Sequence, residues 1–175
     1  MTVSLVDKVK AVASALDGRV PYAFGGAIAL AYATEEPRGT RDLDVNVFVA
    51  AADVDEVFAA LPSGVVHGDA DRAAVLQDEQ VRLWWDDTPV DVFFAAHPFH
   101  VAAGQRSRTV DFDGTPIRVL APDDLAVFKV LFDRPKDWVD IATMIESGTL
   151  DVDAVARQVE ALLGDDPRVG RVRSM

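Results

Sequence analysis

The sequence contains no cysteine, which excludes disulfide bonds and thiolate metal sites. It has no apolar run near the ~18 residues of a membrane-spanning helix, and its first residues lack the apolar core of a signal peptide. Positive charge is scarce, because 17 Lys and Arg residues stand against 29 Asp and Glu residues, a net charge of −12. We therefore expect a cytoplasmic protein with no membrane partner, whose overall field repels nucleic acid.

Hydrophobic residues make up 50% of the 175-residue chain, enough for a sizeable core without covalent cross-links. The length indicates one domain, or one domain with a small helical appendage. Some of the basic residues form local groups, in residues 38–41, 129–136 and 168–173. A nucleic-acid partner would have to contact one of these groups.

Helices and strands are predicted from apolar spacing and from the Gly and Pro residues that punctuate it. Helical spacing occurs in residues 3–16, 27–33, 54–61, 98–104, 122–132, 135–146 and from 151 or 153 to 163. Strands are expected over residues 20–24 and 43–49, and hairpins join 81–85 to 90–94 and 109–112 to 116–120. For residues 65–80 we expect a strand stub and a short helix over 71–76.

This order of elements predicts an α/β (α+β) fold, in which helices flank a mixed β-sheet and a helical segment follows. The expected organisation is a core over residues 1–120, a helical segment over 121–165 that packs on it, and a tail over 166–175.

Two carboxylates and two glycines stand near each other early in the chain. Asp42 and Asp44 begin a strand, where alternation places both side chains on one face, so they suit a shared hard cation. They are also compatible with one carboxylate that caps the strand and one that is merely solvated. Gly25 and Gly26 lie between a strand and a helix, a junction that presents backbone N–H groups to an anion but that also occurs as plain structural punctuation.

Asp91 lies in the run Pro-Val-Asp-Val-Phe-Phe, which is otherwise apolar. A charge in such a run needs a partner, because an unpaired buried charge costs several kcal/mol. The sequence leaves two kinds of partner open. One is a metal ion shared with Asp42 and Asp44, and the other is an arginine such as Arg41 or Arg82.

The order of these parts resembles the nucleotidyltransferase superfamily: a glycine pair after the first strand, an Asp-x-Asp on the next, and a third carboxylate later. The stretch Arg-Gly-Thr-Arg-Asp-Leu-Asp-Val looks most like the AbiEii-type branch, the nucleotidyltransferase toxins of bacterial type IV toxin–antitoxin systems. The resemblance implies a nucleotidyltransferase-like fold in which Gly25 and Gly26 hold the nucleotide's phosphates. Asp42, Asp44 and Asp91 would bind Mg²⁺ or Mn²⁺, and Asp91 could help to deprotonate the attacking hydroxyl.

A second match covers residues 119–141, which are similar to the segment of that branch in which a lysine on one helix precedes an Arg-x-Lys-Asp at the next helix start. The resemblance implies further residues that face the nucleotide: Thr40, Arg41, Lys129, Arg134, Lys136 and Asp137. Cations around a phosphate also suit phosphoryl transfer on physical grounds. The alternative is that Lys129 and Lys136 are solvated helix residues and that Asp137 only caps its helix.

Other side chains give weaker signals. His67, His97 and His100 share no metal-ligand spacing on one element, and we expect core or surface histidines. Trp84 and Trp85 are adjacent on a strand, so they must face opposite ways, one of them into the core.

The predicted function is a Mg²⁺-dependent nucleotidyltransferase that moves a nucleoside monophosphate from an NTP to an acceptor hydroxyl. The expected acceptors are a tRNA 3′ end, a protein hydroxyl and a small molecule such as an aminoglycoside, and a cognate antitoxin is a further expected partner. The alternative is a non-catalytic protein of the same fold that binds a nucleotide or a partner.

Overall fold

The computed structural model describes residues 3–175, which form two compact units. The first unit comprises the described residues up to 28 together with 39–120, and the second comprises residues 29–38 and 121–175. The helix α2 (Gly26–Thr34) therefore begins in the first unit and ends in the second. The sequence pattern placed residues 29–38 with the core, whereas the structure groups them with the C-terminal helices.

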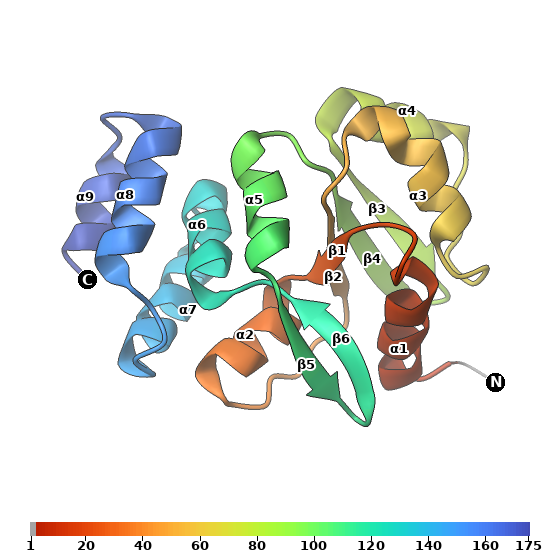
Figure 1. The fold of residues 1–175 in the computed structure, drawn as a ribbon, viewed down its shortest axis with the longest axis horizontal. Helices are drawn as coiled ribbons and strands as arrows, with labels where there is room; N and C mark the ends of the chain where they lie inside the picture. Colours follow the sequence, from red (N-terminus) through yellow and green to blue (C-terminus); the bar gives the residue numbers. More distant parts are fainter. Residues whose placement is uncertain (1–2) are drawn as a thin grey trace. The chain divides into compact units, whose positions relative to one another are not determined.

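The first unit is built on a mixed sheet of six strands in the order β3-β4-β2-β1-β6-β5 (Figure 1). The strands are β1 (Tyr22–Phe24), β2 (Leu43–Val47), β3 (Gln80–Trp85), β4 (Thr88–Phe93), β5 (Arg108–Phe112) and β6 (Thr115–Val119). β2 runs parallel to β4 and antiparallel to β1, and β1 runs parallel to β6. The predicted α/β fold class with a mixed sheet is confirmed.

Both predicted hairpins form, β3 with β4 and β5 with β6. The turn between β5 and β6 carries Asp113 and Gly114, whose φ angles of 48° and 77° are those that a two-residue hairpin turn requires. In the other hairpin Asp86 takes the left-handed conformation, with a φ of 53°.

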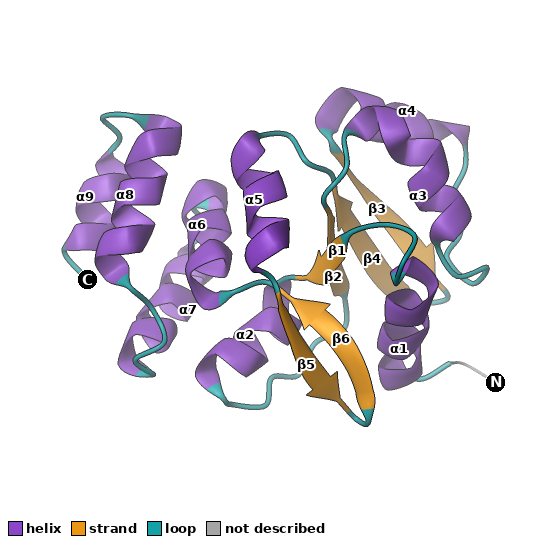
Figure 2. Cartoon of the chain, in the orientation of Figure 1, coloured by secondary structure: helices purple, strands orange, loops and turns teal. Residues whose placement is uncertain are grey.

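The helices of the first unit are α1 (Leu5–Leu16), α3 (Val54–Ala60), α4 (Asp69–Asp78) and α5 (Pro98–Arg106), with a short 3₁₀ turn at Ala51–Asp53 (Figure 2). Residues 65–80, which carried the weakest pattern, contain α4 and a single bridge between Val66 and Trp84. The expected strand stub and short helix are thus present, and the helix is longer than predicted.

One face of β2, β3 and β4 is apolar and buried. Its members are Leu43, Val45, Val47, Leu83, Trp85, Val90 and Val92. The opposite face of the same strands carries Asp44, Asp91 and Arg82, because side chains alternate along each strand. Trp84 belongs to this second face and is 48% exposed, whereas Trp85 is buried, as the alternation predicts.

Lys8 anchors the β3–β4 hairpin to α1. Its side chain is buried, and its ammonium donates to the Trp85 carbonyl at 2.8 Å and to the Thr88 hydroxyl at 3.0 Å. The Asp86 carboxylate lies 3.3 Å away and offsets the charge. These contacts hold in place the two strands that carry Arg82 and Asp91.

The second unit contains four further helices and the end of α2. They are α6 (Pro122–Phe132), α7 (Pro135–Glu146), α8 (Val152–Leu163) and α9 (Pro167–Arg173), and the bounds of α6 and α7 are those predicted. No helix in residues 3–175 combines the length and apolar character needed to cross a membrane.

Residues 166–175 are not the tail that the sequence predicted, because α9 occupies most of them. Asp166 caps this helix by accepting from the backbone N–H of Arg168 at 2.9 Å. Val169 and Val172 are buried, and the Arg171 guanidinium lies 3.9 Å from the centre of the Trp138 ring. Two apolar residues in a short basic stretch give little sequence signal, so packing within the unit decides this helix.

Candidate functional site

Asp42 immediately precedes β2, and Asp44 is the second residue of this strand, on the face opposite the apolar core. Thr40 fixes the first of them, since its hydroxyl donates to the Asp42 carboxylate at 2.7 Å. The Thr40 hydroxyl also accepts from the Asp42 backbone N–H at 3.3 Å. In the structure Thr40 therefore orients Asp42, while Arg41, the other loop residue predicted to face the nucleotide, is exposed.

The glycine turn lies directly against the second carboxylate. The Gly25 N–H donates to the Asp44 carbonyl at 2.9 Å, and Gly26 has a φ of +50°, a conformation that favours glycine. A Cβ atom added at Gly26 would collide with the Asp44 carboxylate. At Gly25 it would come within 2.8 Å of the Asn46 amide nitrogen. The structure thus brings the glycine pair against Asp44, which lies 18 and 19 residues further along the sequence.

Asn46 and His100 form a partly buried polar contact beside this turn. The His100 Nε2 lies 3.3 Å from the Asn46 Oδ1, and Asn46 is 5% exposed. The backbone N–H of Ala96 donates to His100 Nδ1, so Nε2 carries the proton that Asn46 accepts. Burial, together with the charge of His97, lowers the pKa of His100 to about 4, so the ring is neutral at pH 7. Sequence reasoning missed this pair, although Asn46 alternates in step with Asp42 and Asp44.

Asp91 is paired with an arginine, one of the two partners that the sequence left open. The Arg82 guanidinium donates to both carboxylate oxygens, Nε to Oδ1 and Nη2 to Oδ2, each at 2.7 Å. The two residues are cross-strand neighbours on β3 and β4, and Asp91 is in turn the neighbour of Asp44 on β2. The bond to Asp91 and its charge, with smaller contributions from Asp42 and Asp44, raise the pKa of Arg82.

A divalent cation fits the first two carboxylates better than the third. Within residues 3–175 no group of three His, Cys, Asp or Glu side chains is arranged to hold a metal ion, and Asp91 is bonded to Arg82. Asp42 and Asp44 nevertheless supply hard oxygen donors. Mg²⁺ is commonly bound by one or two carboxylates, with water and substrate phosphates in the remaining positions. A Cβ atom at Gly26 would collide with the Asp44 carboxylate, so this carboxylate and the turn lie directly against each other.

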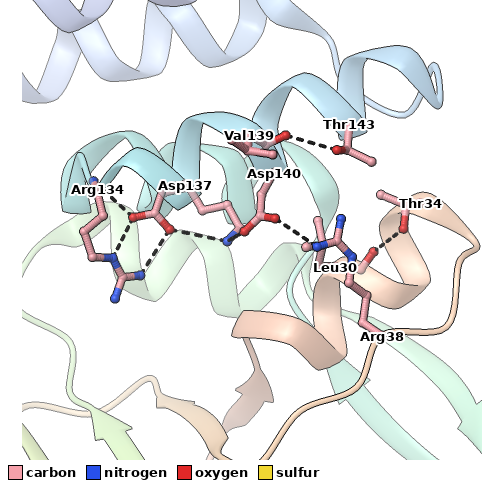
Figure 3. A network of polar contacts seen from close by, with 9 residues as sticks. Leu30, Thr34, Arg38, Arg134, Asp137, Val139, Asp140 and Thr143 are labelled. Atoms are coloured by element: carbon pink, nitrogen blue, oxygen red, sulfur yellow. Dashed lines mark hydrogen bonds and ion pairs between the residues drawn. The ribbon is translucent and has the colours of Figure 1, made fainter.

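Three residues of the second predicted set, Lys129, Arg134 and Asp137, belong to an ion-pair network within the second unit (Figure 3). The Lys129 ammonium lies 2.7 Å from the Asp140 carboxylate and 3.5 Å from that of Asp137. Arg134 donates to Asp137 at 2.7 Å, and Arg38 donates to Asp140 at 3.2 Å. Each of these carboxylates therefore contacts one lysine and one arginine.

Burial distinguishes the members of this network. The Lys129 side chain is 8% exposed and that of Asp137 is 0% exposed. Burial acts to raise the pKa of Asp137, but the Arg134 hydrogen bond and the Lys129 charge outweigh it and hold this pKa below its usual value. Lys136, also predicted to line the nucleotide pocket, is exposed.

The comparisons with known proteins identify the fold. No family model matches the chain and no curated protein matches it. Among solved structures, the crystal structure of ANT(2″)-Ia in complex with adenylyl-2″-tobramycin has a TM-score of 0.60 and 15% identity, over 98% of this chain and 98% of that one. The solution structure of this antibiotic-resistance factor gives a TM-score of 0.57 at 16% identity, over 99% and 91% of the two chains.

A third match is JHP933 from Helicobacter pylori, with a TM-score of 0.50 and 16% identity over 97% of this chain and 78% of that one. At these identities the likeness concerns the fold. The chain has a nucleotidyltransferase-like fold. The fold that the resemblance implied is thus confirmed.

Proposed function

We propose that this protein is a nucleotidyltransferase that transfers a nucleoside monophosphate from an NTP to an acceptor hydroxyl. The observation that carries the proposal is the contact of the Gly25–Gly26 turn with Asp44, because a glycine turn at a helix start suits a phosphate and a carboxylate suits a metal ion. The likeness to ANT(2″)-Ia over 98% of both chains supports it, because that protein was crystallised in complex with adenylyl-2″-tobramycin.

In the proposed reaction each group has a defined task. Asp42 and Asp44 would hold Mg²⁺ or Mn²⁺, which supplies charge to the phosphates of the NTP. The first turn of α2 begins at Gly26, and backbone N–H groups at a helix start have no acceptor within the helix, so they suit a phosphate. Asp91 would take the proton of the acceptor hydroxyl, for which its carboxylate has to part from Arg82.

The acceptor that we favour is a cationic small molecule with hydroxyl groups. The net charge of −12 repels RNA and attracts a cation. ANT(2″)-Ia, which is covered over 98% of its length, was crystallised with adenylyl-2″-tobramycin. A tRNA 3′ end remains the acceptor that the AbiEii-type resemblance of residues 38–45 supports, with a cognate antitoxin as the partner.

The test is transfer of label from each of the four NTPs, in the presence of Mg²⁺, to an aminoglycoside, to tRNA and to protein. We expect one labelled acceptor and release of pyrophosphate. Asp42→Asn and Asp44→Asn should each abolish transfer, whereas the control Asp78→Asn removes an equal charge from the exposed end of α4 and should leave it intact. Absence of transfer to every acceptor, with NTP binding unchanged in both site variants, would refute the proposal.

The second candidate is a non-catalytic nucleotide-binding protein, which the Arg82–Asp91 pair favours because it neutralises the proposed base. Calorimetric titration separates the two functions. Binding of NTP without any dependence on Mg²⁺ would support the non-catalytic protein, and Mg²⁺-dependent binding supports the transferase.

A further inference from the structure

Three charged side chains form a row across neighbouring strands of the first unit. Asp44 on β2 is in register with Asp91 on β4, and Asp91 is in register with Arg82 on β3. Registered residues on adjacent strands project from the same face of a sheet, at a strand separation of about 4.8 Å. Asp91 is thus the middle member, with a carboxylate neighbour on one side and a guanidinium on the other.

The Arg82–Asp91 pair is not needed to hold the hairpin together. β3 and β4 are already joined over a continuous register of backbone pairs from Gln80↔Phe93 to Trp85↔Thr88. Lys8 fixes the turn of the same hairpin from α1. The backbone pairing therefore already determines the geometry of the hairpin, and the ion pair neutralises the charge of Asp91.

The guanidinium can leave without unfolding the sheet. The Arg82 side chain is 55% exposed, whereas that of Asp91 is 15% exposed. Ion pairs that are open to water are held weakly and exchange with other partners. A divalent cation carries twice the charge of the guanidinium, and a position beside Asp44 would place it next to Asp91 as well.

We propose that Arg82 is a resident counter-ion of the carboxylate row, and that a divalent cation gains Asp91 as a third ligand only by displacing the Arg82 guanidinium. This inference rests on the proposed function, because it assigns Asp42 and Asp44 to the cation. Asp91 then has two states, one facing Arg82 and one facing the cation beside Asp44.

The decisive measurement is the affinity for Mn²⁺ in the absence of nucleotide. The electron paramagnetic resonance signal of the free ion reports how much Mn²⁺ is bound. Arg82→Gln removes the competing cation, so we expect Mn²⁺ to bind about tenfold more tightly than to the wild-type protein. Arg72→Gln is the matched control, because Arg72 makes an equivalent two-bond pair with Asp55 at 2.8 and 3.1 Å in the same unit. The control should bind Mn²⁺ as the wild-type protein does.

A double variant identifies the carboxylate that is released. In Arg82→Gln combined with Asp91→Asn the gain in Mn²⁺ affinity should disappear, because the freed ligand is absent. A gain that persists there, or an Arg82→Gln variant that binds Mn²⁺ no more tightly than the wild type, would overturn the proposal. Arg82→Lys keeps the positive charge but cannot form the two parallel hydrogen bonds. Its Mn²⁺ affinity should lie between those of the wild-type protein and Arg82→Gln.

The wild-type protein gives an independent test that needs no folded variant. The Arg82 Nε–H resonance should shift as Mg²⁺ is added, as the guanidinium leaves Asp91; a resonance that stays in place at saturating Mg²⁺ contradicts displacement. The two proposals fail separately. Tighter Mn²⁺ binding by Arg82→Gln in a protein that transfers no label supports the counter-ion role of Arg82 and refutes the transferase function. Label transfer with Mn²⁺ affinity unchanged in Arg82→Gln supports the transferase function and refutes the counter-ion role.

Discussion

The two units each contain an ion-pair cluster, and the clusters differ in the exposure of the cation. In the first unit Arg82 is half exposed and faces Asp91. In the second unit Lys129 is buried between Asp137 and Asp140. A buried cation cannot leave its carboxylates without uncompensated charge, whereas a half-exposed one exchanges its partner for water. The exposures agree with the proposed exchange of partners in the first cluster and lead us to expect that the second stabilises its unit.

This difference bears on the predicted role of Lys129 in phosphate binding. To reach a phosphate, the Lys129 ammonium would have to part from the Asp140 carboxylate at 2.7 Å and leave the fully buried Asp137 with Arg134 alone. The role implied by the resemblance stays a prediction, and the structure adds a stabilising role that can be measured beside it.

The largest expected effect is the loss of stability in Lys129→Met. Removing one partner of a buried ion pair typically costs about 3–5 kcal/mol, because the remaining charges are left uncompensated. The free energy of unfolding in urea measures the loss. Lys136→Met, at an exposed site seven residues further on, should change it by less than about 0.5 kcal/mol. Lys129→Met with wild-type stability but weakened NTP binding would reverse the assignment and make Lys129 a phosphate ligand.

The second expected effect is a pH dependence that originates in the first unit. Burial lowers the pKa of His100 to about 4 in the folded protein. Between about pH 6.5 and pH 4 this side chain is therefore protonated in the unfolded chain and neutral in the folded protein. Stability is therefore full above pH 6.5 and falls by about 2–3 kcal/mol as the pH drops to 4. Urea denaturation between pH 7 and 4 measures it. His100→Gln should flatten this part of the profile, and His67→Gln, at an exposed site, should not.

The third prediction concerns the turn that contacts Asp44. In Gly26→Ala the added methyl group combines a positive φ with a collision against the Asp44 carboxylate. We expect the free energy of unfolding to fall by about 1–3 kcal/mol more than backbone strain alone would cause. We also expect weaker Mn²⁺ binding. Gly18→Ala is the control for strain alone, because Gly18 has a φ of +69° and nothing within 4 Å of an added Cβ. Equal losses in the two variants would show that the turn does not press on Asp44.

The smallest expected effect tests the comparison directly. Arg82→Gln should lower the free energy of unfolding by no more than about 1 kcal/mol, since the cation of this pair is half exposed. A loss as large as that of Lys129→Met would mean that both clusters are structural, and it would remove the basis for a partner exchange at Asp91.

Much of the fold follows from local pattern. The bounds of α6 and α7 and both hairpins were predicted, because Pro at a helix start and Asp-Gly in a turn act through the backbone of adjacent residues. The common face of Asp42 and Asp44 likewise needs only the alternation of a strand. Helix α9 escaped prediction, since its few apolar residues become informative only when their packing partners are known.

The candidate site depended on contacts that no local rule supplies. The sequence by itself determined that Asp91 needs a partner, because a charge in an apolar run is costly wherever the run folds. Only the tertiary structure decided that this partner is Arg82 and not Arg41, since strand register places Arg82 opposite Asp91. The partners of Lys8 and His100 were decided in the same way, by contact with residues distant in the sequence.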